Sequence, residues 1–392
     1  MKPIKGVLFM IKVTEDVYYI GVDDTDIDLF EGQYAVPNGV SYNSYVCIDG
    51  KIAVFDTVDK RKTYEWLKNL EEALNGLQPD YLIVSHMEPD HAASIPEFLK
   101  KYPSATVVGN EKTFSMIKRF FVNLTANVLT VKEGNELDLG NHKISFVFAP
   151  MVHWPEVMMT YDKTDKILFS ADAFGKFGAY AQNEDWLDEA RRYFINIVGK
   201  YGNPVQAVLK KAATLDIKAI CPLHGPILKE SLGYYINKYD IWSSYRPEED
   251  GVLLAVASVY GNTAEAAGIL ADKLQKRGIK VEICDLSRCD TSQAIATAFK
   301  YSKLVIASIT YDGGIMPCAE TFINKLKSKN YSNRKVGFIQ NGSWAPVAAK
   351  IMRSNMEGFK SLSFCDVTVT VNSALDGAAE EQLTALADEL AK

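Results

Sequence analysis

Short apolar runs alternate with polar segments along the chain, and in the part before residue 243 they predict many strands with helices between some of them. The predicted strands are Val17–Ile20, Ser44–Ile48, Ile52–Phe55, Tyr81–Val84, Thr106–Val108, Lys143–Phe148, Ile167–Phe169 and Lys218–Cys221. The predicted helices are Lys60–Asn75, Ser94–Lys101, Glu111–Phe121 and Leu187–Lys200. This mixture indicates a layered α/β body with sheets inside and helices outside.

A polar, proline-containing segment, Ser243–Asp250, separates this part from a second one with a simpler rhythm. The predicted strands there are Val252–Ala257, Val281–Ile283, Leu304–Ser308, Val336–Gln340 and Val367–Val371. The predicted helices are Thr263–Arg277, Cys318–Lys327, Ala345–Met356 and Ala378–Ala391. Such alternation is typical of a doubly wound, flavodoxin-like parallel sheet, whose ligand binds beyond the carboxyl ends of the strands. We therefore expect two domains, residues 1–248 and 249–392.

Length and composition narrow the possible classes of protein. The chain has 392 residues, which suits two or three domains, and its net charge of -6 gives no support to nucleic-acid binding. The apolar run Gly6–Ile11 is too short for a signal peptide, and no later run is long enough to span a membrane. The six cysteines form no C-x-x-C pair, so we expect reduced thiols in a cytoplasmic protein rather than a disulfide scaffold or a built-in rubredoxin-type iron site.

Histidine and acidic residues follow several predicted strands of the first part. The segment Ser85–His91 reads S-H-M-E-P-D-H and comes directly after an apolar run, and three further candidates each follow a later strand. The candidate metal ligands are His86, Glu88, Asp90, His91, His153, Asp172 and His224. Imidazole and carboxylate without thiolate suit iron, manganese or zinc. Six or seven ligands exceed the needs of one tetrahedral ion, so we expect two ions, whereas His142 is expected to be an ordinary residue of a polar turn.

Three loops of the second part have the composition of a flavin site. The loop after the first strand places hydroxyls and backbone N–H groups at a helix N-terminus, which can bind a monophosphate without lysine or arginine. In the other two loops, small residues let the backbone approach a ring, and Tyr or Trp can stack on it. The chain has neither a nucleotide-triphosphate loop nor a G-x-G-x-x-G motif. The candidate residues are Ser258, Val259, Tyr260, Gly261, Asn262, Thr263, then Ser308, Thr310, Tyr311, Asp312, Gly313, Gly314, and finally Asn341, Gly342, Ser343 and Trp344.

These motifs resemble those of known families. The first part resembles the metallo-β-lactamase fold family, whose pattern is H-x-H-x-D-H followed by distant His, Asp and His. Glu88 stands where the hydrolases carry the second histidine, and H-x-E-x-D-H is the pattern of flavodiiron proteins, also called A-type flavoproteins. Glutamate is a harder donor and suits a di-iron site better than a zinc site. The three later loops resemble the FMN-binding loops of flavodoxins and of the flavodiiron C-terminal domain.

The resemblance covers essentially the whole chain and implies a fold and a ligand set. The implied fold is a metallo-β-lactamase-like αββα sandwich followed by a flavodoxin-like domain. It assigns His86, Glu88 and His153 to one iron, Asp90 and His224 to the other, and Asp172 to a bridge between them. For His91, ligation stays open, and for Tyr193, which resembles a tyrosine near the irons of relatives, simple packing is favoured. Asp312 departs from the family, because that loop position is often Asn, and the third loop lacks the usual glycine-rich tail.

The resemblance also implies an activity and partners. Flavodiiron proteins reduce dioxygen to water, nitric oxide to nitrous oxide, or both, with FMN and two non-haem irons. Because the chain ends at Lys392 we expect no fused rubredoxin, and so an external donor such as rubredoxin or a reduced deazaflavin. A head-to-tail homodimer or a dimer of dimers is expected. Two alternatives stay open: a zinc-dependent hydrolase with an attached flavodoxin domain, and a simple electron carrier that uses only the FMN domain. The choice between O₂ and NO is also open.

Overall fold

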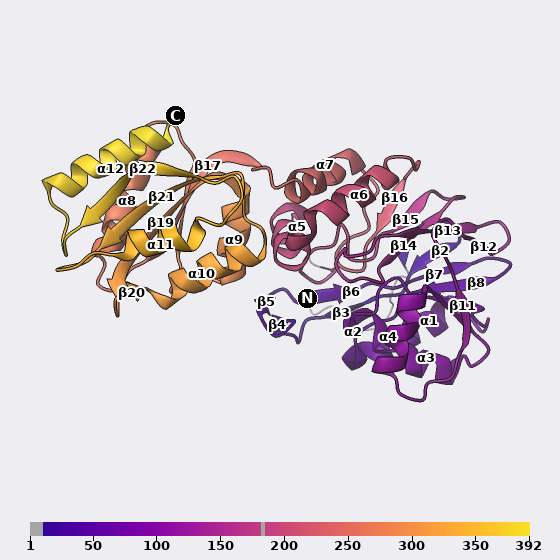
Figure 1. The fold of residues 1–392 in the computed structure, drawn as a ribbon. Coiled ribbons are helices and arrows are strands. Elements are labelled where there is room, and N and C mark those ends of the chain that lie inside the picture. Colours follow the sequence, from indigo (N-terminus) through magenta and orange to yellow (C-terminus); the bar gives the residue numbers. More distant parts are fainter. Residues whose placement is uncertain (1–10, 182–184) are drawn as a thin grey trace, which may run out of the picture. The chain divides into compact units, whose positions relative to one another are not determined.

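The computed structural model describes residues 11–181 and 185–392, which form two compact units (Figure 1). The first unit is Met1–Tyr193 with Asn203–Asn237, and the second is Phe194–Gly202 with Lys238–Lys392. Each unit has its own buried apolar cluster. The predicted division after residue 248 stays a prediction.

The first unit is built on two sheets that pack face to face. One sheet has the order β1 (Ile11–Lys12), β2 (Val17–Tyr19), β7 (Tyr45–Ile48), β8 (Ile52–Phe55), β9 (Tyr81–Ile83), β10 (Thr106–Gly109) and β11 (Asn127–Thr130). The other has the order β12 (Glu136–Asp138), β13 (Lys143–Phe148), β14 (Met158–Asp162), β15 (Ile167–Phe169) and β16 (Ala219–Cys221). Inward-facing residues of both sheets share one core, in which the rings of Phe55 and Phe169 stack at 3.9 Å.

Helices and two small two-stranded sheets complete the first unit. The helical segments are η1 (Lys60–Lys62), α1 (Thr63–Leu74), α2 (Pro89–Ala92), α3 (Ile95–Lys101), α4 (Glu111–Phe120), α5 (Trp186–Tyr193) and α6 (Gly202–Ala212). The short strands β3 (Val22–Asp24) and β6 (Val40–Tyr42) pair with each other, as do β4 (Leu29–Phe30) and β5 (Tyr34–Ala35). The αββα arrangement agrees with the predicted fold.

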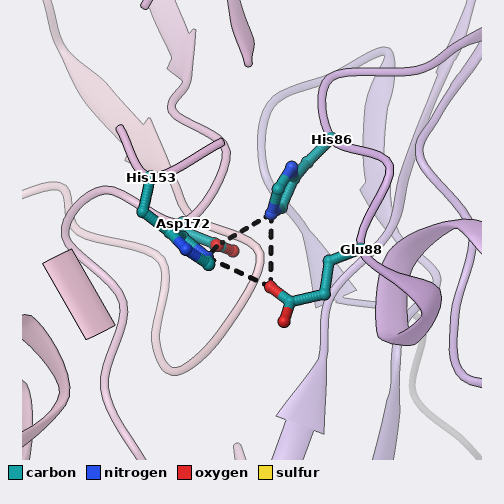
Figure 2. A group of neighbouring side chains, drawn as sticks. All are labelled: His86, Glu88, His153 and Asp172. Atoms are coloured by element: carbon teal, nitrogen blue, oxygen red, sulfur yellow. Dashed lines mark hydrogen bonds and ion pairs between the residues drawn. The ribbon is translucent and has the colours of Figure 1, made fainter. Parts of the chain in front are cut away.

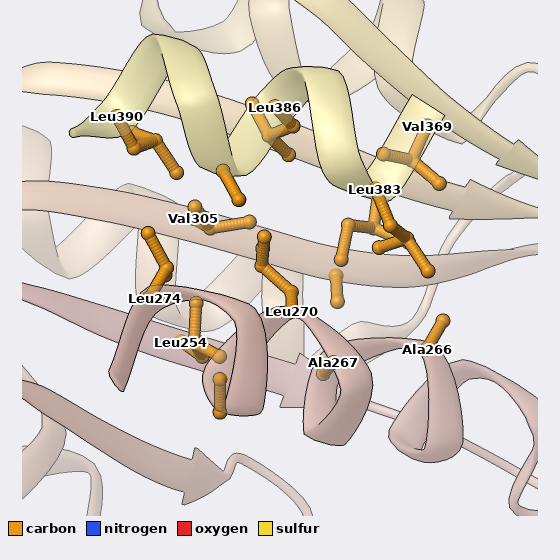
Figure 3. Close-up of a cluster of buried hydrophobic side chains, with 14 of the residues drawn as sticks. Leu254, Ala266, Ala267, Leu270, Leu274, Val305, Val369, Leu383, Leu386 and Leu390 are labelled. Atoms are coloured by element: carbon orange, nitrogen blue, oxygen red, sulfur yellow. The ribbon is translucent and has the colours of Figure 1, made fainter. Parts of the chain in front are cut away.

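The second unit is a parallel sheet covered by helices. The strand order is β18 (Val281–Asp285), β17 (Glu249–Ala257), β19 (Tyr301–Tyr311), β21 (Lys335–Asn341) and β22 (Ser363–Val371), with β20 (Gly314–Ile315) antiparallel to β19. The helices are α7 (Leu232–Ser243, at the boundary of the units), α8 (Asn262–Gln275), α9 (Thr291–Lys300), α10 (Pro317–Ser328), α11 (Ala348–Met356) and α12 (Gly377–Leu390). Leucines of α8 and α12 pack against Leu254, Val305 and Val369 of the sheet (Figure 3). This order confirms the predicted flavodoxin-like sheet.

One predicted helix, Leu187–Lys200, is wrong in its second half. The α-helix ends at Tyr193, and the chain continues as a π-helix, Phe194–Val198, and a 3₁₀-helix, Gly199–Tyr201. All five residues of the π-helical turn are buried, so this segment is shaped by packing on every side rather than by one apolar face.

The cysteine prediction is wrong for one pair. Cys284, in β18, and Cys289, in the turn before α9, form a disulfide with Cα atoms 6.6 Å apart. The turn brings Cys289 back beside the end of β18, whereas the spacing of five residues between the two cysteines did not predict a disulfide. Cys47, Cys221, Cys318 and Cys365 are free thiols. In the described ranges, every helix is too short or too polar to cross a membrane.

Candidate metal centre and flavin pocket

The seven predicted metal ligands lie in the segments that follow four strands of the first unit, five of them in loops and two, Asp90 and His91, in the short helix α2. Residues 86–91 follow β9 and enter α2, His153 follows β13 through a cis peptide bond from Val152, and the other two follow β15 and β16. Asp56, at the end of β8, shapes the first loop, because its Oδ1 accepts hydrogen bonds from the backbone N–H groups of Ser85 at 2.7 Å and His86 at 3.2 Å. The ligand loops are therefore fixed by the ends of two sheets.

One group of side chains consists of His86, Glu88, His153 and Asp172 (Figure 2). The Nε2 atoms of His86 and His153 lie 3.2 Å and 3.1 Å from Oε2 of Glu88. The same two nitrogens lie 3.4 Å and 3.1 Å from Oδ2 of Asp172. Two imidazoles and two carboxylates thus direct one donor atom each toward a common point.

A second group, Asp90, His91 and His224, adjoins the first. The Nε2 atoms of the two histidines are 3.0 Å apart, and Oδ2 of Asp90 lies 3.3 Å from each. Oδ1 of Asp172 lies 3.3 Å from Nε2 of His91 and 3.8 Å from Nε2 of His224. Asp172 therefore faces one group with each of its oxygens, and His91, whose ligation the sequence left open, points into the second group.

The polar atoms of the second group are incompletely satisfied by the described residues. Both oxygens of Asp90, Oδ1 of Asp172 and Nδ1 of His91 are buried without a hydrogen-bond partner there. Burying such groups unpaired costs about 1–3 kcal/mol each. By contrast, Nδ1 of His224 is bonded to the backbone oxygen of Ser41 at 2.7 Å, which leaves Nε2 toward the group. Cations between the two groups would satisfy these carboxylate oxygens, so the residues present fit two metal ions.

The electrostatics of the first group also favour positive charge. Burial raises the pKa of Asp172, but the neighbouring imidazoles outweigh burial and hold this pKa well below its usual value. The pKa of Glu88 is lowered for the same reason. For His153, burial lowers the pKa, yet the hydrogen bonds to Asp172 and Glu88 raise it to about 9. The carboxylates are thus anions paired with protonated imidazoles, and a bound metal ion would take the place of the imidazole protons.

A cavity of about 450 Å³ adjoins the metal ligands. Glu88 and Asp90 line it, together with Phe30 and Glu31 of the β4–β5 hairpin and Arg61. Burial and the nearby Glu88 carboxylate raise the pKa of Glu31 to about 7. The cavity gives small molecules a place beside the candidate metal centre.

Three further residues, Glu156, Tyr193 and His142, are buried; two of them contact metal-type histidines and the third lies apart. Glu156, which the sequence analysis did not single out, is buried with Oε1 2.7 Å from Nδ1 of His86; its only sequence signal is its place three residues after His153. Tyr193 is buried, and its ring centre is 5.4 Å from that of His224. His142 lies apart from the metal ligands, as predicted, but it is buried and its Nδ1 is 2.9 Å from Oδ2 of Asp162.

The second unit contains a cavity of about 770 Å³, a size typical of cofactor sites. All three predicted loops contribute to its lining. The predicted residues that line it are Ser258, Val259, Tyr260, Asn262, Thr263, Thr310, Asp312, Gly313, Asn341, Gly342, Ser343 and Trp344, whereas Gly261, Ser308, Tyr311 and Gly314 belong to the loops without lining the cavity.

The first of these loops fits a phosphate group. Gly261 has a φ of 98°, and α8 begins directly after it. Oγ of Ser258 accepts hydrogen bonds from the N–H groups of Gly261 and Ala264, both at 3.3 Å. The hydroxyl of Thr263 is buried and has no partner among the described residues. A phosphate oxygen at the helix N-terminus would supply that partner.

The other two loops fit an aromatic ring system. Oγ1 of Thr310 accepts hydrogen bonds from the N–H groups of Val347 at 2.9 Å and Ala348 at 3.2 Å, which ties the second loop to the start of α11. Helix α11 therefore begins at Ala348 rather than at the predicted Ala345, since residues before it line the cavity. Tyr260 and Trp344 at the rim are 94% and 92% exposed, so their ring faces are available for stacking.

Comparison with known proteins agrees with this geometry. Residues 40–225 match the family model described as ODP family beta lactamase, and residues 253–367 match the flavodoxin domain model. The chain is 28% identical over 361 residues to a nitric oxide reductase of Moorella thermoacetica, an alignment covering 89% of this chain and 90% of that protein.

Solved structures share the fold over nearly the whole chain. The rubredoxin oxygen:oxidoreductase of Desulfovibrio gigas superposes with a TM-score of 0.91 at 24% identity, covering 97% of this chain and 98% of the other. A variant of the flavo-di-iron protein of Thermotoga maritima superposes with a TM-score of 0.85 at 25% identity, covering 97% and 96%.

Proposed function

Because this chain belongs to the flavodiiron protein family, we propose that it is an oxidoreductase that reduces dioxygen to water, nitric oxide to nitrous oxide, or both. The observation that carries the proposal is the position of Asp172, whose two oxygens face two adjoining groups of metal-type side chains. The same chain has a cavity whose loops fit FMN. A metal pair and a flavin together suit a reaction that consumes several electrons.

Each residue of the centre has a proposed part. His86, Glu88 and His153 would hold one iron, Asp90, His91 and His224 would hold the other, and Asp172, with one oxygen toward each group, would serve both. When bound, the two irons and FMN supply the electrons for gas reduction. The chain itself buries the centre, fixes the donor atoms, and leaves a cavity bounded by the β4–β5 hairpin in which a diatomic gas can lie.

The electron route and the assembly are proposed from the family. An external protein such as rubredoxin supplies electrons to the flavin, in line with the name of the D. gigas enzyme. A head-to-tail homodimer brings the flavin of one chain to the irons of another. The two relatives named for oxygen and for nitric oxide support either gas as substrate.

The test is the consumption of O₂ and of NO, recorded side by side with electrodes, by iron- and FMN-loaded protein with chemically reduced rubredoxin as donor. We expect rapid consumption of at least one gas, and a rate difference of about tenfold or more would identify the preferred one. If neither gas is consumed, the proposed activity is wrong. Two tightly bound zinc ions with hydrolytic activity would then favour the metallo-β-lactamase-type hydrolase.

A further inference from the structure

Glu156 lies directly behind one of the metal ligands. Its carboxylate is buried, and Oε1 is 2.7 Å from Nδ1 of His86, the ring nitrogen that faces away from the metal-type group. The same oxygen accepts a hydrogen bond from the backbone N–H of Met87 at 2.9 Å. The backbone of Glu156 is itself held, because its carbonyl accepts a hydrogen bond from Nδ2 of Asn110 at 2.6 Å. This carboxylate is therefore fixed against the imidazole.

The histidines of the second group have different partners. Nδ1 of His224 donates to the neutral backbone oxygen of Ser41 at 2.7 Å. Nδ1 of His91 is buried and has no hydrogen-bond partner among the described residues. Of these three imidazoles, only that of His86 is bonded at Nδ1 to a carboxylate in the described structure. The first group thus has a histidine whose outer nitrogen is hydrogen-bonded to a carboxylate, and the second group has none in the described structure.

A carboxylate on the outer nitrogen of a ligating histidine has two known effects. It fixes the tautomer and ring orientation, and it makes the other nitrogen a stronger donor; its loss typically weakens metal affinity by about 10–100-fold. Accepting the Nδ1 proton of His86 leaves its Nε2 free to bind a cation, and this nitrogen lies within the first group, 3.2 Å from Glu88.

We propose that Glu156 is a positioning residue that makes the two metal positions unequal, so that the position held by His86 binds its ion more tightly and fills first. This inference rests on the proposed function, because it takes the two groups to be the two metal positions of one centre. It goes beyond the proposed function in two respects: the order in which the two positions bind their ions, and the residue that determines this order.

The experiment is an anaerobic titration of the metal-depleted, full-length protein with Fe²⁺, and in parallel with Co²⁺, whose visible absorption reports each binding step. The wild-type chain should take up two ions in two steps of unequal affinity. Glu156→Gln keeps the size of the side chain and an oxygen that can accept from Met87, but it removes the negative charge. It should weaken the tighter step by about 10–100-fold and leave the weaker step within about threefold.

Two control variants make the result specific. Asp162→Asn removes the carboxylate from a buried histidine–carboxylate pair outside the two groups, that with His142, and should leave both steps unchanged. His224→Ala removes a donor of the second group and should abolish the weaker step while the tighter step remains sensitive to Glu156→Gln. Thermal unfolding of each metal-depleted variant checks that the fold is retained.

The outcomes separate the inference from the proposed function. Two equal steps in the wild-type chain, or equal weakening of both steps by Glu156→Gln and Glu156→Ala, would overturn the inference and leave Glu156 as a support of the loop alone. A wild-type chain that binds no ions would overturn the proposed di-metal centre itself, and the inference with it.

Discussion

At the scale of single residues, Asp172 carries the strongest prediction, because it is fully buried and faces both groups of ligands. Asp172→Asn removes a negative charge and one possible donor oxygen. Since losing even a residue that supports a metal ligand costs about 10–100-fold, we expect gas reduction to fall by about 100-fold or more. Iron content should drop below that of the wild-type protein, whereas FMN, bound in the other unit, should be retained.

The measurement pairs gas electrodes with iron and FMN analysis of the same sample. Asp165→Asn is the matched control, because Asp165 lies near His142 and Asp162 and outside both ligand groups. Gas consumption by the Asp172 variant at the wild-type rate would contradict the proposed bridge.

Thr263 allows a prediction about the flavin pocket. Its hydroxyl is buried without a partner among the described residues, at the N-terminus of α8. Thr263→Val keeps the shape of the side chain and removes the hydroxyl. A hydrogen bond to a charged phosphate is worth about 1.5–3 kcal/mol, so the Kd for FMN should rise by about tenfold or more, while the stability of the flavin-free protein should not fall.

Quenching of flavin fluorescence measures this affinity, and chemical unfolding measures the stability. Thr384→Val serves as the control, since the hydroxyl of Thr384 lies on α12 and donates a hydrogen bond within its own helix, to the carbonyl of Glu380. An unchanged Kd for the Thr263 variant would show that the phosphate lies elsewhere.

The sequence could reveal which residues belong together, but not all of their contacts. Each candidate ligand lies in the segment that follows a strand, and strand ends meet at a sheet edge, so the convergence of these seven side chains could be foreseen. Their roles as ligands stay predictions. Glu156 could not be found in this way. It lies in a loop 70 residues from His86, and nothing in its local pattern distinguishes it from a solvated glutamate.

At the scale of elements, the strands were predictable where a short apolar run is bounded by polar turns. Ile52–Phe55, Lys143–Phe148 and Ile167–Phe169 are confirmed with the same ends. Helix α9 (Thr291–Lys300) was missed, although Asp290 caps it through a hydrogen bond to the N–H of Ser292. Three of its six buried residues are alanines and one is a serine, so the apolar pattern of this segment is weak, and its packing in the folded protein reveals the helix.

The pair of His142 and Asp162 joins the turn between β12 and β13 to the end of β14, and it predicts a pH dependence of stability. The hydrogen bond to Asp162 raises the pKa of His142 from 6.5 to about 9, against a smaller opposing effect of burial. Asp16 and Asp165 also face the imidazole, and Asp49 accepts from its backbone N–H. Because the folded state holds this proton more tightly, the stabilisation is complete below pH 6.5 and is lost as the pH rises through about 9.

We therefore expect the free energy of unfolding of the first unit to fall between pH 6.5 and 9.5 in the wild-type protein. Asp162→Asn should be less stable at pH 6.5 and should show a smaller fall over this range. Urea unfolding, followed by circular dichroism at both pH values, measures the difference. Equal slopes for the two proteins would mean that the pair does not contribute.

At the scale of the whole molecule, the two candidate sites belong to separate compact units, each with its own core. Variants of one site should therefore leave the other loaded, and their effects on metal and FMN content should be independent. Gas reduction, in contrast, needs both sites to work together. Because the two sites can be damaged separately but are both needed for activity, it is possible to test whether electrons pass within one chain or between chains.

The test mixes two inactive variants. Asp172→Asn damages the metal centre, and Ser258→Asp keeps an acceptor for the N–H groups of Gly261 and Ala264 while its charge repels a phosphate. In a head-to-tail dimer of one chain of each kind, the intact flavin site of one chain serves the intact metal centre of the other. Random reassociation of equal amounts makes about half of the dimers mixed. Each mixed dimer has one pair of an intact flavin site and an intact metal centre, where a wild-type dimer has two. Activity should therefore recover to about a quarter of the wild-type value. Transfer within each chain would leave the mixture no more active than its parents, because neither chain then has both sites.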